Sequence, residues 1–365
     1  MSKRVSALID TGAILRNAKR VKEKAGNKKL IGVIKANAYG HGDIEAARVL
    51  SEVCDMFAVA EAHEALHLKK NGVKKDIIIL SMIPGEDIKD CLEEGVILTV
   101  SDLSEGERIS RIAKNTSLTA HVHAAVDTGM NRIGFKADSS EEEDIKKLSQ
   151  MDNISLEGIF SHYAVSDIKD KTFTHLQTER FKKVCDEAGA GRLCHIANSA
   201  AIMDTDKLYG EAVRAGIILY GLLPSDEVKK DSIKLEPALT FKSRVSFVKE
   251  IHKGDAVSYG LTFTADKTMK IATVSAGYAD GYPRALSGKG RVLINGESRN
   301  IVGRICMDQF MVDVTGSDVK VDDEVILIGR SGNEYISADE VASLAGTINY
   351  EIVCSIGMRV PRIYI

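Results

Sequence analysis

Eight short, almost continuous apolar runs divide the first two thirds of this 365-residue chain. They are Leu30–Ala36, Phe57–Ala60, Ile77–Leu80, Ile97–Val100, Ala120–Val126, Leu156–His162, Cys194–Asn198 and Val213–Tyr220. Most are followed by a charged segment with helical apolar spacing, such as Asp43–Cys54 or Thr172–Ala188. Strands that are apolar on both faces are typical of a parallel sheet covered by helices. Eight of them in alternation with helices predict an α/β chain with a (β/α)8 barrel. The open doubly wound alternative would normally have a Gly-x-Gly-x-x-Gly turn after its first strand, and this chain has none.

The pattern changes near Leu235 to strands separated by Gly, Asp and Asn turns, with little helix between them. The expected strands are Phe241–Ile251, Met269–Val274, Arg291–Ile294, Phe310–Val314 and Glu324–Ile328, and one helix is expected near Ser337–Leu344. The sequence therefore predicts a barrel domain over residues 1–235 and a mainly β domain over residues 236–365. The first ten or so residues could pair with the second domain.

Composition excludes several classes of function. The formal net charge is -3, so no basic field suggests nucleic acid or an anionic membrane as a partner. No apolar run approaches the roughly 18 residues of a membrane span, and the N-terminus has no signal-peptide core, so we expect a cytoplasmic protein. The six cysteines are scattered without a C-x-x-C pair, which predicts free, mostly buried thiols and no metal site.

Lys35 ends the first apolar run and is followed by Ala-Asn-Ala-Tyr-Gly-His-Gly. Barrel active sites lie at the C-terminal ends of the strands, where Lys35 would sit. Partial desolvation there lowers the pKa of a lysine and frees its amine for attack on a carbonyl. On position alone, an ordinary solvated lysine at a strand end is the better interpretation.

The whole string Val33–Gly42 changes that balance, because it strongly resembles the lysine signature of the alanine racemase family, which uses pyridoxal 5'-phosphate (PLP). The resemblance continues in the family's order through nearly the whole chain. It covers segments 126–134, 158–162, 195–200, 213–217, 257–260, 277–282, 303–308, 347–351 and 359–362. A chance match of this extent across both predicted domains is not a reasonable explanation.

The resemblance implies a PLP enzyme that racemises alanine with two bases. Lys35 would hold the cofactor and act on one face of the substrate, while Tyr259, from the partner subunit of a homodimer, would act on the other. A free tyrosine titrates near ~10, and the family supports its tyrosine through a hydrogen-bonded chain from His162 to Arg214. Arg214 would face the pyridine nitrogen, which it cannot protonate, so the cofactor becomes a weaker electron sink.

The remaining roles follow from the same resemblance. Further cofactor-binding residues would be Tyr39, His195, Asn198, Ser199, Gly216, Ile217 and Tyr350. Arg132 and the backbone N–H of Met307 would bind the substrate carboxylate. Tyr278 and Asp308 would line the access path, with Arg284 as a weaker candidate that equally fits a plain surface arginine.

One position departs from the family. Many members carry a carbamylated lysine seven residues before the arginine that corresponds to Arg132, whereas this chain has Ala125. Alanine has no side-chain group that could be carbamylated. We therefore expect water, an anion or a neighbouring side chain to orient Arg132, and a carbamate bonded to Arg132 would contradict this.

The expected product is D-alanine for bacterial cell-wall peptidoglycan, and three alternatives remain. A racemase of the same fold could prefer serine or accept a broader set of amino acids. A PLP-dependent decarboxylase of basic amino acids shares the two-domain plan, and Cys306 keeps that possibility open. A non-catalytic PLP carrier with a similar barrel would lack the second domain and Tyr259.

Overall fold

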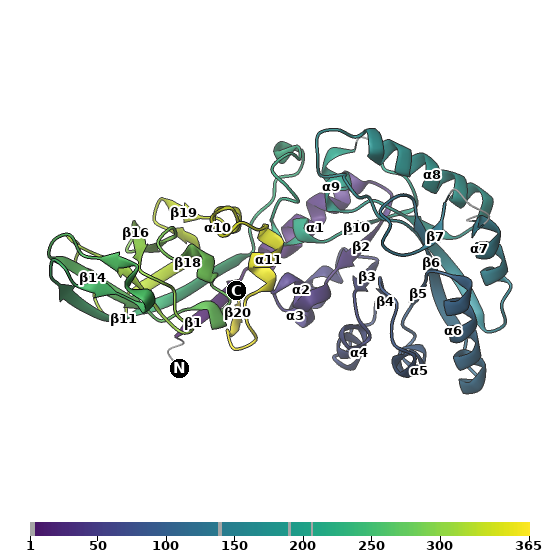
Figure 1. Ribbon diagram of the computed structural model, residues 1–365. Helices are drawn as coiled ribbons and strands as arrows, with labels where there is room; N and C mark the ends of the chain where they lie inside the picture. Colours follow the sequence, from purple (N-terminus) through teal and green to yellow (C-terminus); the bar gives the residue numbers. More distant parts are fainter. Residues whose placement is uncertain (1–3, 138–140, 189–190, 206) are drawn as a thin grey trace. The chain divides into compact units, whose positions relative to one another are not determined.

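The computed structural model describes residues 4–137, 141–188, 191–205 and 207–365. The chain divides into two compact units, each described separately below (Figure 1). The barrel unit comprises residues 12–38 and 43–237. The β unit comprises residues 1–11, 39–42 and 238–365, so a short stretch that follows Lys35 belongs to it.

Eight parallel strands form the ring of the barrel unit's sheet, in the order β4-β3-β2-β10-β9-β8-β6-β5, and the short β7 (Phe135–Lys136) pairs with β6 beside this ring. They are β2 (Lys29–Val33), β3 (Met56–Val59), β4 (Asp76–Ile79), β5 (Leu98–Val100), β6 (Ala120–Asp127), β8 (Ile154–Phe160), β9 (Leu193–His195) and β10 (Ala212–Ala215). A parallel bridge between Ile78 and Ile97 joins β4 to β5 and closes the ring. The predicted (β/α)8 barrel followed by a mainly β domain is confirmed.

Helices follow most of the barrel strands, and their apolar faces are buried. They are α1 (Thr11–Ala25), α3 (Asp43–Leu50), α4 (Ala62–Lys70), α5 (Gly85–Glu93), α6 (Leu103–Thr116), α7 (Glu141–Ser149), α8 (Thr172–Ala188) and the short α9 (Ser199–Asp204). Helix α8 has the predicted bounds, whereas α3 ends at Leu50, four residues before Cys54. Four predicted barrel strands are shorter than expected, and the last two of them, β9 and β10, give way to helical turns. The run after β9 turns into α9, and residues Ile217–Tyr220 form a 3-10 helix, η1.

The β unit is built on a nine-stranded sheet of order β19-β18-β15-β16-β17-β14-β11-β1-β20. Its strands are β1 (Val5–Ile9), β11 (Leu239–Ile251), β14 (Met269–Val274), β15 (Arg291–Ile294), β16 (Glu297–Val302), β17 (Phe310–Asp313), β18 (Glu324–Ser331), β19 (Glu334–Ile336) and β20 (Arg362–Tyr364). Strand β1 pairs antiparallel with β11 and parallel with β20, so both ends of the chain belong to this sheet. All five predicted strands are present, together with β16, β19, β20 and a small β12–β13 hairpin (Ala256–Val257 and Phe263–Thr264) that the sequence pattern did not reveal.

Two helices and three 3-10 turns complete the β unit. Helix α10 (Ala338–Ala345) begins where predicted, with the Ser337 hydroxyl accepting the Glu340 N–H. Helix α11 (Asn349–Cys354) was not predicted. The turns η3 (Tyr259–Leu261), η4 (Tyr278–Asp280) and η5 (Arg284–Leu286) carry several of the predicted site residues.

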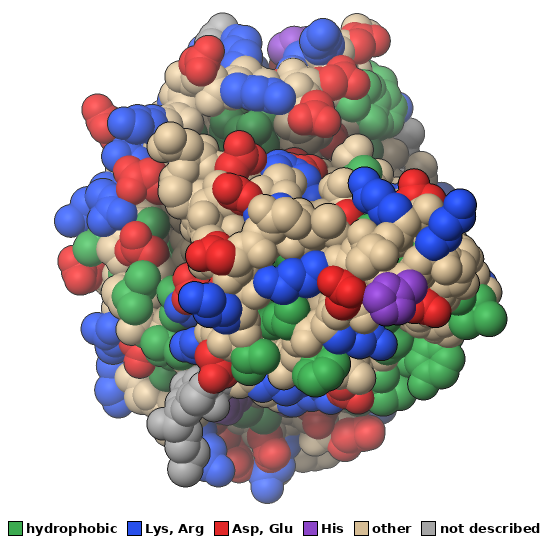
Figure 2. Space-filling view, turned by 90° about the vertical axis from the view of Figure 1, so that its left-hand side faces the viewer, with side chains coloured by type: hydrophobic (Ala, Val, Ile, Leu, Met, Phe, Trp, Pro, Cys, Tyr) green, Lys and Arg blue, Asp and Glu red, His purple; other side chains and the backbone are tan. Residues whose placement is uncertain are grey.

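Surface and thiol chemistry agree with the composition. All six cysteines are free and four of them are buried, as predicted. Figure 2 shows Lys and Arg side chains interspersed with Asp and Glu, without a broad area of one charge on the face drawn. Among the residues described, no helix combines the length and the apolarity that a membrane span needs.

Candidate functional site

Lys35 lies two residues beyond β2 and opens a strained backbone turn. Residues 36–39, Ala-Asn-Ala-Tyr, all have φ between 52° and 54°, in the left-handed region. That conformation costs non-glycine residues about 1–2 kcal/mol each, so other contacts must hold it. The Ala36 N–H donates to Glu64 Oε1 at 2.5 Å, and the Asp43 N–H donates to Asn37 Oδ1 at 3.0 Å. Strain of this kind, held by contacts with the surrounding structure, is typical of functional sites.

Arg214 on β10 is buried and holds the ends of neighbouring strands together. Its Nη1 donates to His195 Nδ1 at 2.6 Å and to the His195 carbonyl at 2.8 Å. Its Nη2 donates to the Ser161 carbonyl at 2.6 Å, to the Ile196 carbonyl at 3.2 Å and to His162 Nδ1 at 3.2 Å. Every one of these acceptors is an uncharged group. Burial, followed by repulsion from Arg132, lowers the pKa of Arg214 to about 9, so it remains a cation at neutral pH.

His162 lies where three positive charges converge. Burial lowers its pKa to about 3, with further lowering by the charges of Arg214, Arg132 and Lys35, in that order. His162 is therefore neutral at physiological pH. A neutral imidazole whose pKa is lowered by the charges of three cations, one of them hydrogen-bonded to it, marks a site suited to an anionic ligand.

Arg132 comes from the loop after β6, and its side chain is exposed. That loop is fixed by Asp127, whose Oδ1 accepts the N–H of Gly129 at 2.9 Å and of Asn131 at 3.0 Å. Ala125, two residues earlier in the chain, is buried in β6 opposite Phe160. The position that carries the carbamylated lysine in many family members is thus filled by a packed methyl group.

Ser199 and Gly216, two of the residues expected around the phosphate, are hydrogen-bonded to each other. The Gly216 N–H donates to Ser199 Oγ at 2.9 Å, which joins the start of α9 to the start of η1. Asn198 caps α9 through its Oδ1, which accepts the Ala201 N–H at 3.0 Å and the Ser166 hydroxyl at 2.8 Å. The Asn198 side-chain oxygen therefore has a structural role in shaping this loop. Ile217, which follows Gly216, is fully buried.

Within the β unit, Tyr39 and Tyr350 face each other. Their ring centroids are 6.0 Å apart.

Tyr259, on the turn η3, has 73% of its surface exposed. Its turn is fastened by the Ser258 hydroxyl, which donates to the Arg304 carbonyl at 2.7 Å.

Met307 and Tyr278 lie on two loops that are hydrogen-bonded to each other. The Ala279 N–H donates to the Met307 carbonyl at 3.0 Å, and the Tyr278 N–H donates to the Cys306 carbonyl at 3.2 Å. Gly277 permits this approach, since a Cβ there would lie 2.3 Å from the Met307 carbonyl oxygen. Both predicted side chains are exposed, Met307 by 52% and Tyr278 by 42%. Arg284, on η5, is also exposed.

Asp280 anchors these loops from beneath. It is fully buried and pairs with Arg4 at 2.5 Å and with Arg359 at 2.8 Å. Its second oxygen accepts the Gly277 N–H at 2.9 Å. Arg359 also reaches Asp308, which is one of the predicted access-path residues, at 2.7 Å.

The sequence interpretation did not identify Asp280, Glu64 or His123 as parts of the site. Glu64 has a recognisable local signal, since a Glu three residues into a helix often turns back to the helix start, and here it accepts the Glu61 N–H at 3.2 Å. Its bond to Ala36 joins residues 28 positions apart and leaves no such signal.

Comparisons with known proteins agree over the full length. The family model described as alanine racemase, N-terminal domain, matches residues 9–224, and that of the alanine racemase C-terminal domain matches residues 238–364. Alanine racemase of Desulforamulus reducens is 45% identical over 100% of both chains. Two solved structures are similar. Alanine racemase of Clostridium difficile 630 is 40% identical with a TM-score of 0.95, covering 100% of this chain and 96% of the other. Alanine racemase of Bacillus anthracis with bound L-Ala-P is 36% identical with a TM-score of 0.93, at the same coverage.

We predict that acid destabilises the fold through its buried histidines. Burial lowers the pKa of His123 to about 3 and that of His195 well below its ordinary value. Below pH 6.5 the unfolded chain protonates these groups while the folded chain does not, so stability is full above pH 6.5 and is lost as the pH falls. Each such histidine contributes a slope of about 1.4 kcal/mol per pH unit.

Urea unfolding at pH 7, 6 and 5 measures this slope. His123→Asn should flatten it by one histidine. Equal free energies of unfolding at pH 7 and pH 5 in the wild type would contradict the prediction.

We also predict that Asp280→Asn destabilises the chain by about 3 kcal/mol, the lower end for a broken buried pair, because both arginines are partly exposed. Asp308→Asn is the matched control. It removes another carboxylate from Arg359, but one that is 56% exposed, so its effect should stay within about 1 kcal/mol. Similar midpoints of urea unfolding for the two variants would show that Asp280 does not anchor the loops.

Proposed function

This chain belongs to the alanine racemase family, and on that basis we propose that it interconverts L-alanine and D-alanine with PLP bound at Lys35. The chain is an isomerase, and its activity moves one proton from one face of the substrate Cα to the other. The observation that carries the proposal is the set of three cations around His162, which suits a cofactor and a substrate that both bear negative charge.

The residues of the barrel unit fit PLP. The described hydrogen bonds of Arg214 use only Nη1 and Nη2, so its Nε–H remains available to donate to the pyridine nitrogen. Ser199, Gly216 and Ile217 would hold the phosphate. His195 and Asn198 would support the ring and the phosphate loop. Bound PLP supplies an electron-withdrawing ring that acidifies the Cα–H of the amino acid.

The chain itself supplies the two bases. The Lys35 amine would take or return the proton on one face, and the Tyr259 hydroxyl on the other, which requires no movement of the substrate between the two steps. His162 accepts a hydrogen bond from Arg214 at Nδ1, so as a neutral ring it carries its hydrogen on Nε2. That N–H is the donor that would stabilise the Tyr259 oxygen after it loses its proton.

The exposure of Tyr259 supports a homodimer with shared sites. A base that must work away from water is 73% exposed in the single chain, and Met307, proposed to bind the substrate carboxylate through its N–H, is 52% exposed. A partner subunit that covers Tyr259 and Met307 would shield both from water. Tyr278, Asp308 and Arg284 would then line the access path of the same shared site.

Arg132 would bind the substrate carboxylate. Because Ala125 offers no carbamate, we propose that water, an anion or a neighbouring polar group orients the guanidinium. The product D-alanine fits supply to peptidoglycan synthesis in the cytoplasm.

We predict that the protein, loaded with PLP, racemises L-alanine faster than it racemises any other L-amino acid, when each amino acid is assayed separately. Lys35→Ala should abolish conversion, and Tyr259→Phe should lower kcat by about 10²–10⁴-fold, the usual contribution of a general acid or base. In D2O, Tyr259→Phe should still exchange the Cα hydrogen of one alanine enantiomer while losing exchange of the other.

Tyr335→Phe is the matched control, since it removes a tyrosine hydroxyl from the β unit and lies outside the proposed site. D-serine or D-lysine as the main product would keep the fold and cofactor but change the substrate. Absence of any D-product from a protein that binds PLP would favour a decarboxylase or a carrier.

A further inference from the structure

The contact between Arg214 and His195 is the first link of a chain of buried hydrogen bonds. The chain continues from His195 Nε2 to His123 Nδ1, a distance of 2.9 Å. Arg214, His195 and His123 are 3%, 0% and 1% exposed, so all three side chains lie inside the barrel unit. His123 is on β6, and neither the sequence pattern nor the resemblance assigned it a role.

Only one direction of hydrogen bonding is possible along this chain. A guanidinium has donors and no acceptor, so His195 Nδ1 must accept from Arg214. Burial and the charge of Arg214 keep both histidines neutral by lowering their pKa values. His195 therefore carries its hydrogen on Nε2 and donates it to His123 Nδ1, which leaves the His123 hydrogen on Nε2.

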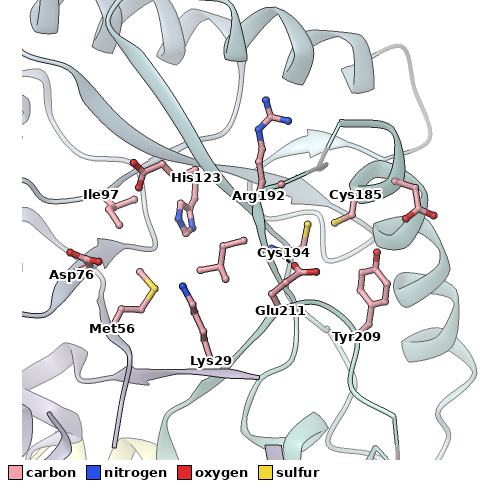
Figure 3. A pocket seen from close by; sticks show the side chains of 14 residues that line it. Lys29, Met56, Asp76, Ile97, His123, Cys185, Arg192, Cys194, Tyr209 and Glu211 are labelled. Atoms are coloured by element: carbon pink, nitrogen blue, oxygen red, sulfur yellow. Dashed lines mark hydrogen bonds between the residues drawn. The ribbon is translucent and has the colours of Figure 1, made fainter. Parts of the chain in front are cut away.

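The chain ends at a cavity on the opposite side of the barrel from Lys35. This cavity has a volume of about 750 Å³, and His123 lines it (Figure 3). Lys29 and Asp76, which also line it, are the first residues of β2 and β4, so the cavity lies at the N-terminal ends of the strands. Figure 3 shows the His123 imidazole with other side chains that line the cavity, among them Met56 and Lys29.

Strand β8 provides the space in which the rings are held. Gly158 is paired with His123 in the sheet, and a Cβ at Gly158 would lie 2.5–2.6 Å from three atoms of the His123 ring. Two residues along, the Phe160 ring stacks on His195 with centroids 5.3 Å apart and an angle of 6°. The Arg214 guanidinium lies 5.5 Å from the centre of the same phenyl ring.

We propose that His123 is a positioning residue for the reaction. Its Nδ1 accepts a hydrogen bond from His195 Nε2–H and thereby fixes the His195 ring, which in turn accepts a hydrogen bond from Arg214 Nη1. The inference rests on the proposed function, in which Arg214 faces the pyridine nitrogen of PLP. Proton transfer along the chain is not its role, because the arginine at its head does not release a proton at neutral pH. What His123 supplies is orientation, since without it the fully buried His195 Nε2–H loses its acceptor among the described residues.

The test compares His123→Leu, which removes the acceptor, with His123→Asn, which keeps an acceptor oxygen on a shorter side chain. Gly158→Ala is an independent way to displace the ring. His121→Leu is the matched control, because His121 is exposed on the same strand. The readouts are kcat and KM for L-alanine, the visible absorption band of the PLP-loaded protein, and the ring-nitrogen NMR signals of ¹⁵N-histidine-labelled protein without PLP.

We expect His123→Leu and Gly158→Ala to lower kcat roughly 10–100-fold with little change in KM, the scale at which removal of a supporting hydrogen bond disturbs a site. The absorption band should shift, His123→Asn should recover most of kcat, and His121→Leu should match the wild type. The NMR spectra should show His195 with its hydrogen on Nε2 in the wild type, and an altered His195 signal in His123→Leu.

A folded His123→Leu or Gly158→Ala protein with wild-type kcat and absorption would overturn the proposal. If His123→Leu does not fold, His123→Asn and Gly158→Ala test the proposal instead. Equal losses of kcat in these two variants, without an altered His195 NMR signal, would also overturn the proposal. The NMR readout separates this inference from the proposed function. A wild type that fails to racemise alanine would defeat the function, while the His195 signal would still report whether His123 holds the ring.

Discussion

The architecture of the site depends on a buried guanidinium whose hydrogen-bond acceptors among the described residues are all uncharged. Arg214 donates to two histidine nitrogens and three carbonyls, and none of these acceptors is charged. A carboxylate in this position would satisfy the arginine internally and leave little charge for a ligand. Because its partners are neutral, Arg214 keeps its positive charge for whatever binds beside it. It also links three strand ends, since it lies on β10 and its acceptors come from β9 and from the segment that follows β8.

The same constraint accounts for other features of the barrel unit. Three histidines, His123, His162 and His195, are kept neutral by burial and by the charge of Arg214, which lower their pKa values. Arg214 donates to Nδ1 of His162 and of His195, which places their hydrogens on Nε2, and His195 in turn sets the tautomer of His123. The strained turn after Lys35 is secured separately, by Glu64 and Asn37, so the lysine and the arginine are held by independent sets of bonds on neighbouring strands β2 and β10. A site made in this way can keep three cations close together before any ligand arrives.

Much of the fold could be predicted from the sequence, but only part of the site. Apolar runs bounded by charged helices gave all eight barrel strands, because burial on both faces leaves a strong local signal. The same signal overextended the run that ends at Tyr220, since a buried 3-10 helix is as apolar as a strand. Strand β16, Glu-Ser-Arg-Asn-Ile-Val, was missed because most of its residues are polar. His123, Glu64 and Asp280 were missed for another reason: their partners lie 72, 28 and more than 75 positions away, and only the folded chain brings them together.

The most direct test of a site shared between subunits is a mixing experiment with two inactive chains. Lys35→Ala and Tyr259→Phe chains, co-expressed with different tags, should form mixed dimers in which one site has both bases intact. Statistical pairing of a two-fold dimer then predicts about a quarter of the wild-type racemase activity in the mixture. Pairing either chain with one that carries both substitutions should recover nothing. Absence of recovery from purified mixed dimers would contradict the account, because it would place Lys35 and Tyr259 of each working site on the same chain.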